Sequence, residues 1–169
     1  MAHSAIAVAN YLLRRARDIG IELTPMHILK LVYIAHGWSL AIGEHPLIRD
    51  EIEAWEYGPV IRSLYDAVKH YGRDPISKPL KIVRVDPATN KVREEEPVEP
   101  FADEERLILD RVVAVYGPVR AYQLSALTHK AGTPWSKAHS EGRSAISDPE
   151  IAEHFRHLAQ EQNVERHAR

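Results

Sequence analysis

One segment, residues 24–42, constrains the fold more than any other part of the chain, because it is apolar on nearly all of its faces. Thr24 is a preferred N-cap residue, and Pro25 follows at the first helical position, where its missing N–H costs no hydrogen bond. We therefore predict a helix from Pro25 to about Ile42. A helix that is apolar all round must be enclosed by other elements, so we expect this helix at the centre of the fold.

Apolar residues at helical spacing predict further helices around this centre. These helices cover residues 4–19, a segment from Pro59 to Val68, residues 104–116 and 118–130, a short segment from Pro134, and a segment after Ser147. A short strand over 51–57 and a small hairpin over 80–93 are the expected β elements. The prediction is a mainly α fold, a single compact helical domain of about six to seven helices with a small β-hairpin or short strands.

The length of 169 residues fits one domain spanning the whole chain. Within it we expect an acidic, turn-rich mobile link over residues 86–102 and a frayed tail over 163–169. Seven carboxylates crowd residues 94–105, and we predict a solvated link that also has the charge to engage a basic patch on a partner. These residues are Glu94, Glu95, Glu96, Glu99, Asp103, Glu104 and Glu105.

Composition excludes several classes of function. The chain contains no cysteine, which rules out disulfides, thiolate metal sites, iron–sulfur clusters and cysteine nucleophiles. The net charge of −2 gives no broad positive field, so nucleic-acid binding would have to be local. No basic leader and no apolar run long enough to span a membrane is present, so we expect a cytoplasmic protein without a membrane partner.

No catalytic motif stands out, so we expect a protein that is not an enzyme and has no cofactor. The chain has neither a nucleophile-elbow serine motif nor a phosphate-binding glycine loop. The best metal-ligand spacing lies on the last predicted helix, where four side chains share one flank. We favour a solvent-exposed face over a metal site for these residues, which are Glu150, His154, His157 and Glu161.

Residues 119–140 have the layout of a helix-turn-helix, with a glycine turn between two predicted helices. The second of these helices carries few basic side chains, and base recognition needs more hydrogen-bond donors. We therefore favour a structural helix hairpin, with a DNA-binding element as the alternative.

Three tryptophans and a tyrosine lie beside glycine and proline at predicted helix ends and turns. Such positions place a large amphipathic ring either in a core or on a binding surface. We predict core packing for Trp38 and leave both interpretations open for Trp55 and Trp135.

Three ordered motifs stand out along the chain: Leu23–Trp38, Ile52–Val60 with Ser63-Leu64-Tyr65, and Leu124–Lys130 with Thr133-Pro134-Trp135-Ser136. Together they resemble the Panacea-domain family of SocA-like antitoxins, and the likeness extends over about residues 4–157. The second helix departs from the family pattern at Leu29, which stands where a glutamine usually precedes the lysine.

The resemblance implies an antitoxin that binds and neutralises a protein toxin encoded by the adjacent gene. It also implies a proteolytic adaptor that delivers the toxin to the ClpXP protease. The alternative is a transcriptional regulator that binds its own promoter DNA through residues 119–140. The residues that we expect to line or support the toxin-binding surface are Trp55, Tyr57, Tyr65, His129 and Trp135.

Overall fold

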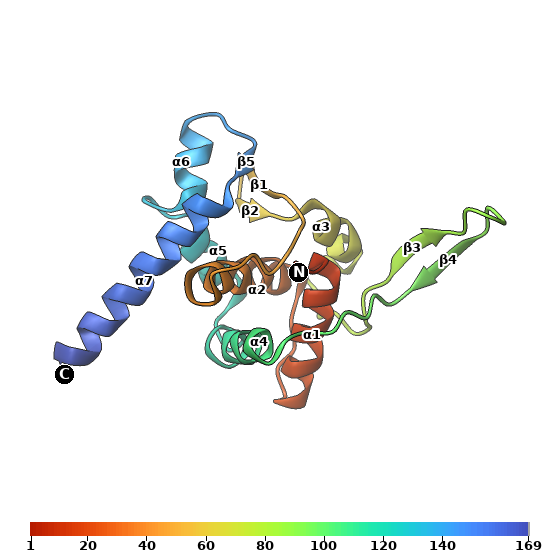
Figure 1. Cartoon of the computed structure of the whole chain (residues 1–169), viewed down its shortest axis with the longest axis horizontal. Helices are drawn as coiled ribbons and strands as arrows, with labels where there is room; N and C mark the ends of the chain where they lie inside the picture. Colours follow the sequence, from red (N-terminus) through yellow and green to blue (C-terminus); the bar gives the residue numbers. More distant parts are fainter. Residues whose placement is uncertain (169) are drawn as a thin grey trace.

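The computed structural model describes residues 1–168, with side chains described through Asn163. Within these residues the fold is mainly α, as predicted, with seven α-helices and a few short antiparallel strands (Figure 1). The helices are α1 (Ala5–Asp18), α2 (Pro25–Trp38), α3 (Arg62–Val68), α4 (Asp103–Tyr116), α5 (Ala121–His129), α6 (Pro134–Ser140) and α7 (Asp148–Ala168). A π-helical turn η1 (Ser39–Gly43) follows α2, and a 3₁₀ turn η2 (Lys69–Tyr71) follows α3.

Helix α2 lies at the centre of the molecule, as its sequence predicts. It packs against α1, α3, α4, α5 and α7, and all of its residues except Met26 and His27 are buried. The Thr24 side chain caps its first turn together with His27. The α-helix ends at Trp38, earlier than the predicted Ile42, because residues 39–43 continue the chain as the wider turn η1.

Three short strands form an antiparallel sheet in the order β2–β1–β5, with β1 at Ile52–Trp55, β2 at Gly58–Val60 and β5 at Ala145–Ile146. The predicted strand over 51–57 is confirmed as β1. The helix predicted to begin at Pro59 instead begins at Arg62, because Gly58–Val60 pair with β1. Strand β5 is only two residues long and was not predicted from the sequence.

The predicted hairpin over 80–93 is confirmed as β3 (Ile82–Val85) and β4 (Val92–Glu95), which project from the helical body (Figure 1). The expectation that all seven acidic residues of 94–105 are solvated is wrong for two of them. Glu99 accepts a hydrogen bond from the Ser4 N–H at 3.1 Å, and Glu105, in the first turn of α4, is only 4% exposed. The ring of His3 lies between these two carboxylates, at 3.1 Å and 2.9 Å.

Helix α7 crosses α2 and then runs outward from the body (Figure 1). Buried His36 fixes its first turn, because His36 Nε2 lies 2.8 Å from Asp148 Oδ1 while Nδ1 faces the N–H groups of Leu47 and Ile48. The predicted frayed tail over 163–169 lies almost entirely outside the residues whose side chains are described. Among the described residues, no helix combines the length and the apolarity needed to span a bilayer.

Candidate protein-binding site

The five residues expected at the binding surface lie together around the β1–β2 hairpin. Trp55 is on β1, Tyr57 in the turn, Tyr65 on α3, His129 on α5 and Trp135 on α6. The rings of Trp55 and Tyr65 meet edge to face at 4.9 Å, and those of His129 and Trp135 at 5.5 Å. The tertiary fold thus brings four separate segments of the chain to one place.

Trp135 on α6 packs against the β1–β2 hairpin and holds one end of it by a hydrogen bond. Its indole N–H donates to the backbone carbonyl of Trp55 at 2.6 Å, and only 9% of the residue is exposed. Its ring also stacks on His139 at 4.7 Å. Trp55 itself is half-buried, and the Arg62 guanidinium lies 5.1 Å above its ring. Trp135 therefore packs inward, while Trp55 keeps part of its surface accessible.

Lys30, which was not predicted from the sequence as a site residue, holds the hairpin turn from α2. Lys30 is 4% exposed, and its ammonium donates to the carbonyls of Pro59 at 3.1 Å and Tyr57 at 3.5 Å. Burial lowers the pKa of Lys30 to about 8. In the described part of the chain no carboxylate forms an ion pair with this ammonium. The available sequence signal was a single lysine on a helix that is apolar on nearly all of its faces.

Gly58 allows this close approach between the turn and α2. Its φ of +118° lies in a region that residues with a side chain rarely adopt. A Cβ atom there would lie 2.8 Å from the Lys30 Nζ atom. From α5, the Ser125 hydroxyl donates to the Tyr57 carbonyl at 3.4 Å. The turn is thus held from both sides, with Tyr57 directed outward.

An open groove of about 540 Å³ runs beside the turn. Its rim carries two exposed side chains, Tyr57 at 73% and Met26 at 45%. Trp55, Tyr65 and Leu29 contribute further apolar lining. Aromatic side chains next to a groove are typical of protein-binding hot spots.

The one pairing here that resembles a catalytic arrangement is Ser125 with His129, whose Oγ and Nδ1 atoms lie 3.4 Å apart. The Ser125 hydroxyl also faces the Tyr57 carbonyl, and among the described hydrogen bonds no carboxylate orients His129. A nucleophilic serine needs a base that a third group orients. The geometry of this site is suited to binding.

The four residues with metal-ligand spacing lie on α7, where other contacts engage three of them. Arg143 binds Glu150 at 2.7 Å, and this hydrogen bond lowers the pKa of Glu150 to about 2. His157 contacts Glu161 at 3.1 Å on the exposed face. Half-buried His154 packs against Phe155, and desolvation lowers its pKa. Among the described residues no group of three metal-ligand side chains is close enough to hold an ion.

The predicted helix pair at 119–140 is present as α5 and α6, joined by a turn in which Gly132 has a φ of +83°. Helix α6 contacts β1 and β5, and it buries Pro134, Trp135 and Ala138. Lys137 is the only lysine or arginine in this seven-residue helix. These contacts match the structural helix hairpin that the sequence favours.

Comparison with known families places this geometry in context. The family model described as "Antitoxin SocA-like, Panacea domain" matches residues 28–136, a segment that contains the five residues expected at the binding surface. The chain belongs to the SocA-like Panacea family. Antitoxin SocA of Caulobacter vibrioides (strain NA1000 / CB15N) is 30% identical over 140 residues, which cover 78% of this chain and 68% of that protein. No solved structure matches the chain significantly.

Proposed function

We propose that this Panacea-domain protein is an antitoxin that binds a protein toxin, encoded by the adjacent gene, through the hairpin surface. This surface consists of Trp55, Tyr57, Tyr65, His129 and Trp135. The observation that carries the proposal is the outward position of Tyr57 on a turn whose backbone is held by Lys30 and Ser125. Family membership supports the antitoxin role.

Rigidity favours this surface as the contact site. Association costs free energy when loops and side chains must become ordered, so a preformed surface loses less on binding. The Trp135 indole and the Lys30 ammonium already fix the two ends of the β1–β2 turn. Tyr57 and the accessible part of Trp55 then act as anchors, with Trp135 and His129 as supports.

Under this proposal the protein acts only by binding the toxin, and it catalyses no covalent reaction. The Ser125–His129 contact lacks an orienting carboxylate among the described residues, which supports this part of the proposal. The proposal further includes delivery of the bound toxin to the ClpXP protease, which is supported by the family resemblance. It is tested by following the toxin's half-life in cells with and without the protease.

The decisive experiment compares two exposed tyrosines. Tyr57→Ala removes the anchor at the turn, whereas Tyr122→Ala removes a tyrosine on α5 that is 61% exposed and does not line the groove. Each variant is co-expressed with the product of the adjacent gene. We expect Tyr57→Ala to weaken co-purification and protection at least tenfold, with Tyr122→Ala unchanged.

Equal protection by both variants would show that the hairpin surface is not the contact site. If the wild-type protein neither binds nor neutralises the adjacent gene product, the antitoxin proposal itself is wrong. Circular dichroism melts of both variants establish that each remains folded.

A further inference from the structure

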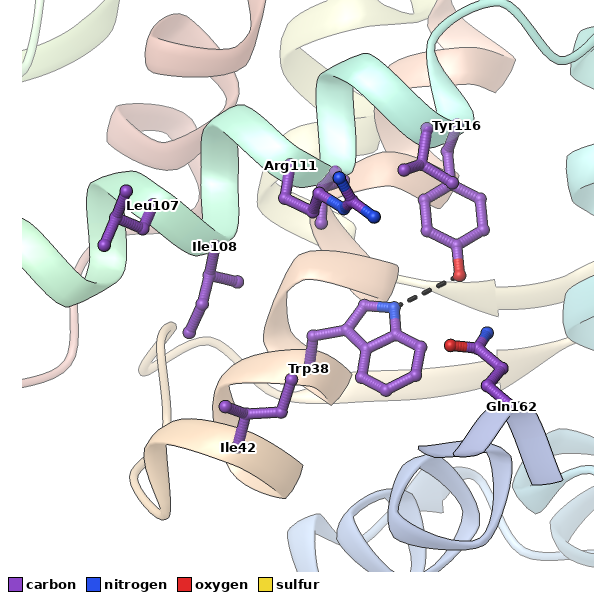
Figure 2. Close-up of a pocket in the computed structure, with 9 residues that line it drawn as sticks. Trp38, Ile42, Leu107, Ile108, Arg111, Tyr116 and Gln162 are labelled. Carbon is purple, nitrogen blue, oxygen red and sulfur yellow. Dashed lines mark hydrogen bonds between the residues drawn. The ribbon is translucent and has the colours of Figure 1, made fainter. Parts of the chain in front are cut away.

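A second groove lies on a different part of the molecule, between α4 and α7, and shares no lining residue with the hairpin groove. Figure 2 shows the Trp38 indole between the side chains of α4 and Gln162 of α7. The groove has a volume of about 350 Å³. Its floor is held in place because the Trp38 indole N–H donates to the Tyr116 hydroxyl at 3.2 Å.

The walls of this groove expose large apolar side chains to solvent. Leu107 is 71% exposed, Ile42 59% and Val115 46%. All three line the same groove, beside Trp38 and Ile108. Single exposed apolar residues need no explanation, but a group of them around one concave surface marks a binding site.

Among the described residues that line this groove, Arg111 is the charged side chain. Arg111 extends over it from α4 (Figure 2), and among the described side chains no carboxylate pairs with Arg111 or lines the groove. An adjoining pocket of about 230 Å³ shares Tyr116 and Gln162 with it and adds Leu127 and Lys130. No carboxylate lines that pocket either, within the described part of the chain. In the described part of the chain this continuous surface is therefore largely apolar, with the cations Arg111 and Lys130 at its rim.

The shape of the groove fits a helix. From Leu107 to Tyr116 the wall formed by α4 is about 14 Å long at 1.5 Å per residue, which matches between two and three helical turns. An amphipathic helix bound between two helices places apolar anchors at i, i+3, i+4 and i+7 into such a surface. Acidic side chains on its flanks would lie beside the cations of the rim.

We propose that the groove lined by Trp38, Ile42, Leu107, Arg111 and Val115 binds an acidic amphipathic helix of a partner protein. The exposed leucine, isoleucine and valine bury the apolar face of that helix, and Arg111 and Lys130 pair with its carboxylates. This site is separate from the hairpin surface, so it stands or fails independently of the proposed toxin contact.

The three tryptophans of the chain make a direct test possible, because each indole N–H gives one resonance in a ¹⁵N-correlated spectrum of the full-length protein. Trp38→Phe assigns the groove resonance. The probe is a synthetic helical peptide with leucines along one face and glutamates elsewhere, and its control carries lysine in place of every glutamate.

We expect the acidic peptide to shift the Trp38 resonance while those of Trp55 and Trp135 stay in place. The lysine peptide should bind at least about tenfold more weakly. Arg111→Glu should weaken binding of the acidic peptide and reverse the preference. Because Arg111 is exposed, this variant should keep the wild-type melting temperature.

Leu107→Ser provides a second variant that removes apolar surface without changing charge, and it should weaken binding of the acidic peptide. The proposal is overturned if the acidic peptide leaves the Trp38 resonance unmoved at millimolar concentration. It is also overturned if both peptides shift it equally, or if Leu107→Ser and Arg111→Glu bind the acidic peptide like the wild type.

Discussion

The indole N–H of Trp135 donates to the backbone carbonyl of Trp55 at 2.6 Å, joining two residues that are 80 positions apart in the chain. This hydrogen bond connects α6 to β1 and sets the end of the hairpin that carries Tyr57. Trp135 is nearly buried and Trp55 is half-buried, so the same contact lies between the core and the candidate binding surface.

The first prediction concerns this hydrogen bond. Trp135→Phe keeps an aromatic ring on α6 but removes the indole donor to the Trp55 carbonyl and part of a buried ring, so we expect a loss of at least about 1 kcal/mol in the free energy of unfolding. Toxin binding should weaken, because the turn is held less firmly. Urea unfolding and co-purification measure the two effects. If the variant binds the toxin and unfolds like the wild type, the Trp135–Trp55 hydrogen bond does not hold the binding surface in place.

The second prediction concerns the contact between α2 and α7. A Cβ atom at Gly37 would lie 2.2 Å from the Phe155 ring, so Gly37→Ala should force α7 away from α2. We expect a destabilisation of about 2 kcal/mol or more, measured by urea unfolding. Adding Phe155→Leu should restore part of the loss by relieving the clash. If the double variant is no more stable than Gly37→Ala, the steric explanation is wrong.

The third prediction concerns pH and Lys30. Burial lowers the pKa of Lys30 from 10.5 to about 8, so between these values the unfolded chain binds more protons than the folded protein. The free energy of unfolding should therefore rise as the pH rises from 8 to 10, and the burial penalty is fully present below pH 8. The upper limit of the gain is about 3 kcal/mol, at about 1.4 kcal/mol per pKa unit.

Lys30→Met is the reference for this effect, because other groups titrate equally in both proteins and cancel in the difference. Urea unfolding of both proteins at several pH values gives that difference. A difference that stays constant from pH 7 to pH 10 would contradict a buried, titrating Lys30.

The fourth prediction contrasts two buried polar side chains. Asn10 on α1 exchanges two hydrogen bonds with the backbone of Leu80, at 2.9 Å and 2.8 Å, so Asn10→Ala leaves a buried N–H and a buried carbonyl without partners. We expect a loss of about 2 kcal/mol in the free energy of unfolding. Tyr33→Phe should cost nothing, because the buried Tyr33 hydroxyl has no hydrogen-bond partner among the described residues. Equal losses in the two variants would contradict this assignment.

Much of the candidate site was predicted from the sequence for two reasons. Its residues lie in motifs that resemble one family, and several of them are aromatic residues beside glycine or proline. That these residues lie close together in space was a hypothesis, and only the tertiary fold could test it. Lys30 was missed because a lysine in a helix is ordinarily expected to reach solvent. Its role depends on the Pro59 carbonyl, which approaches α2 because Gly58 has no side chain.

The sequence by itself determined the helices, the enclosed position of α2 and the β3–β4 hairpin, because apolar periodicity, capping residues and turn residues act on near neighbours. Only the tertiary structure decided that Pro59 belongs to a strand, that β5 pairs with β1, and that Trp38 forms the floor of a groove. These features depend on contacts between distant residues, which local patterns do not encode and which packing around α2 establishes.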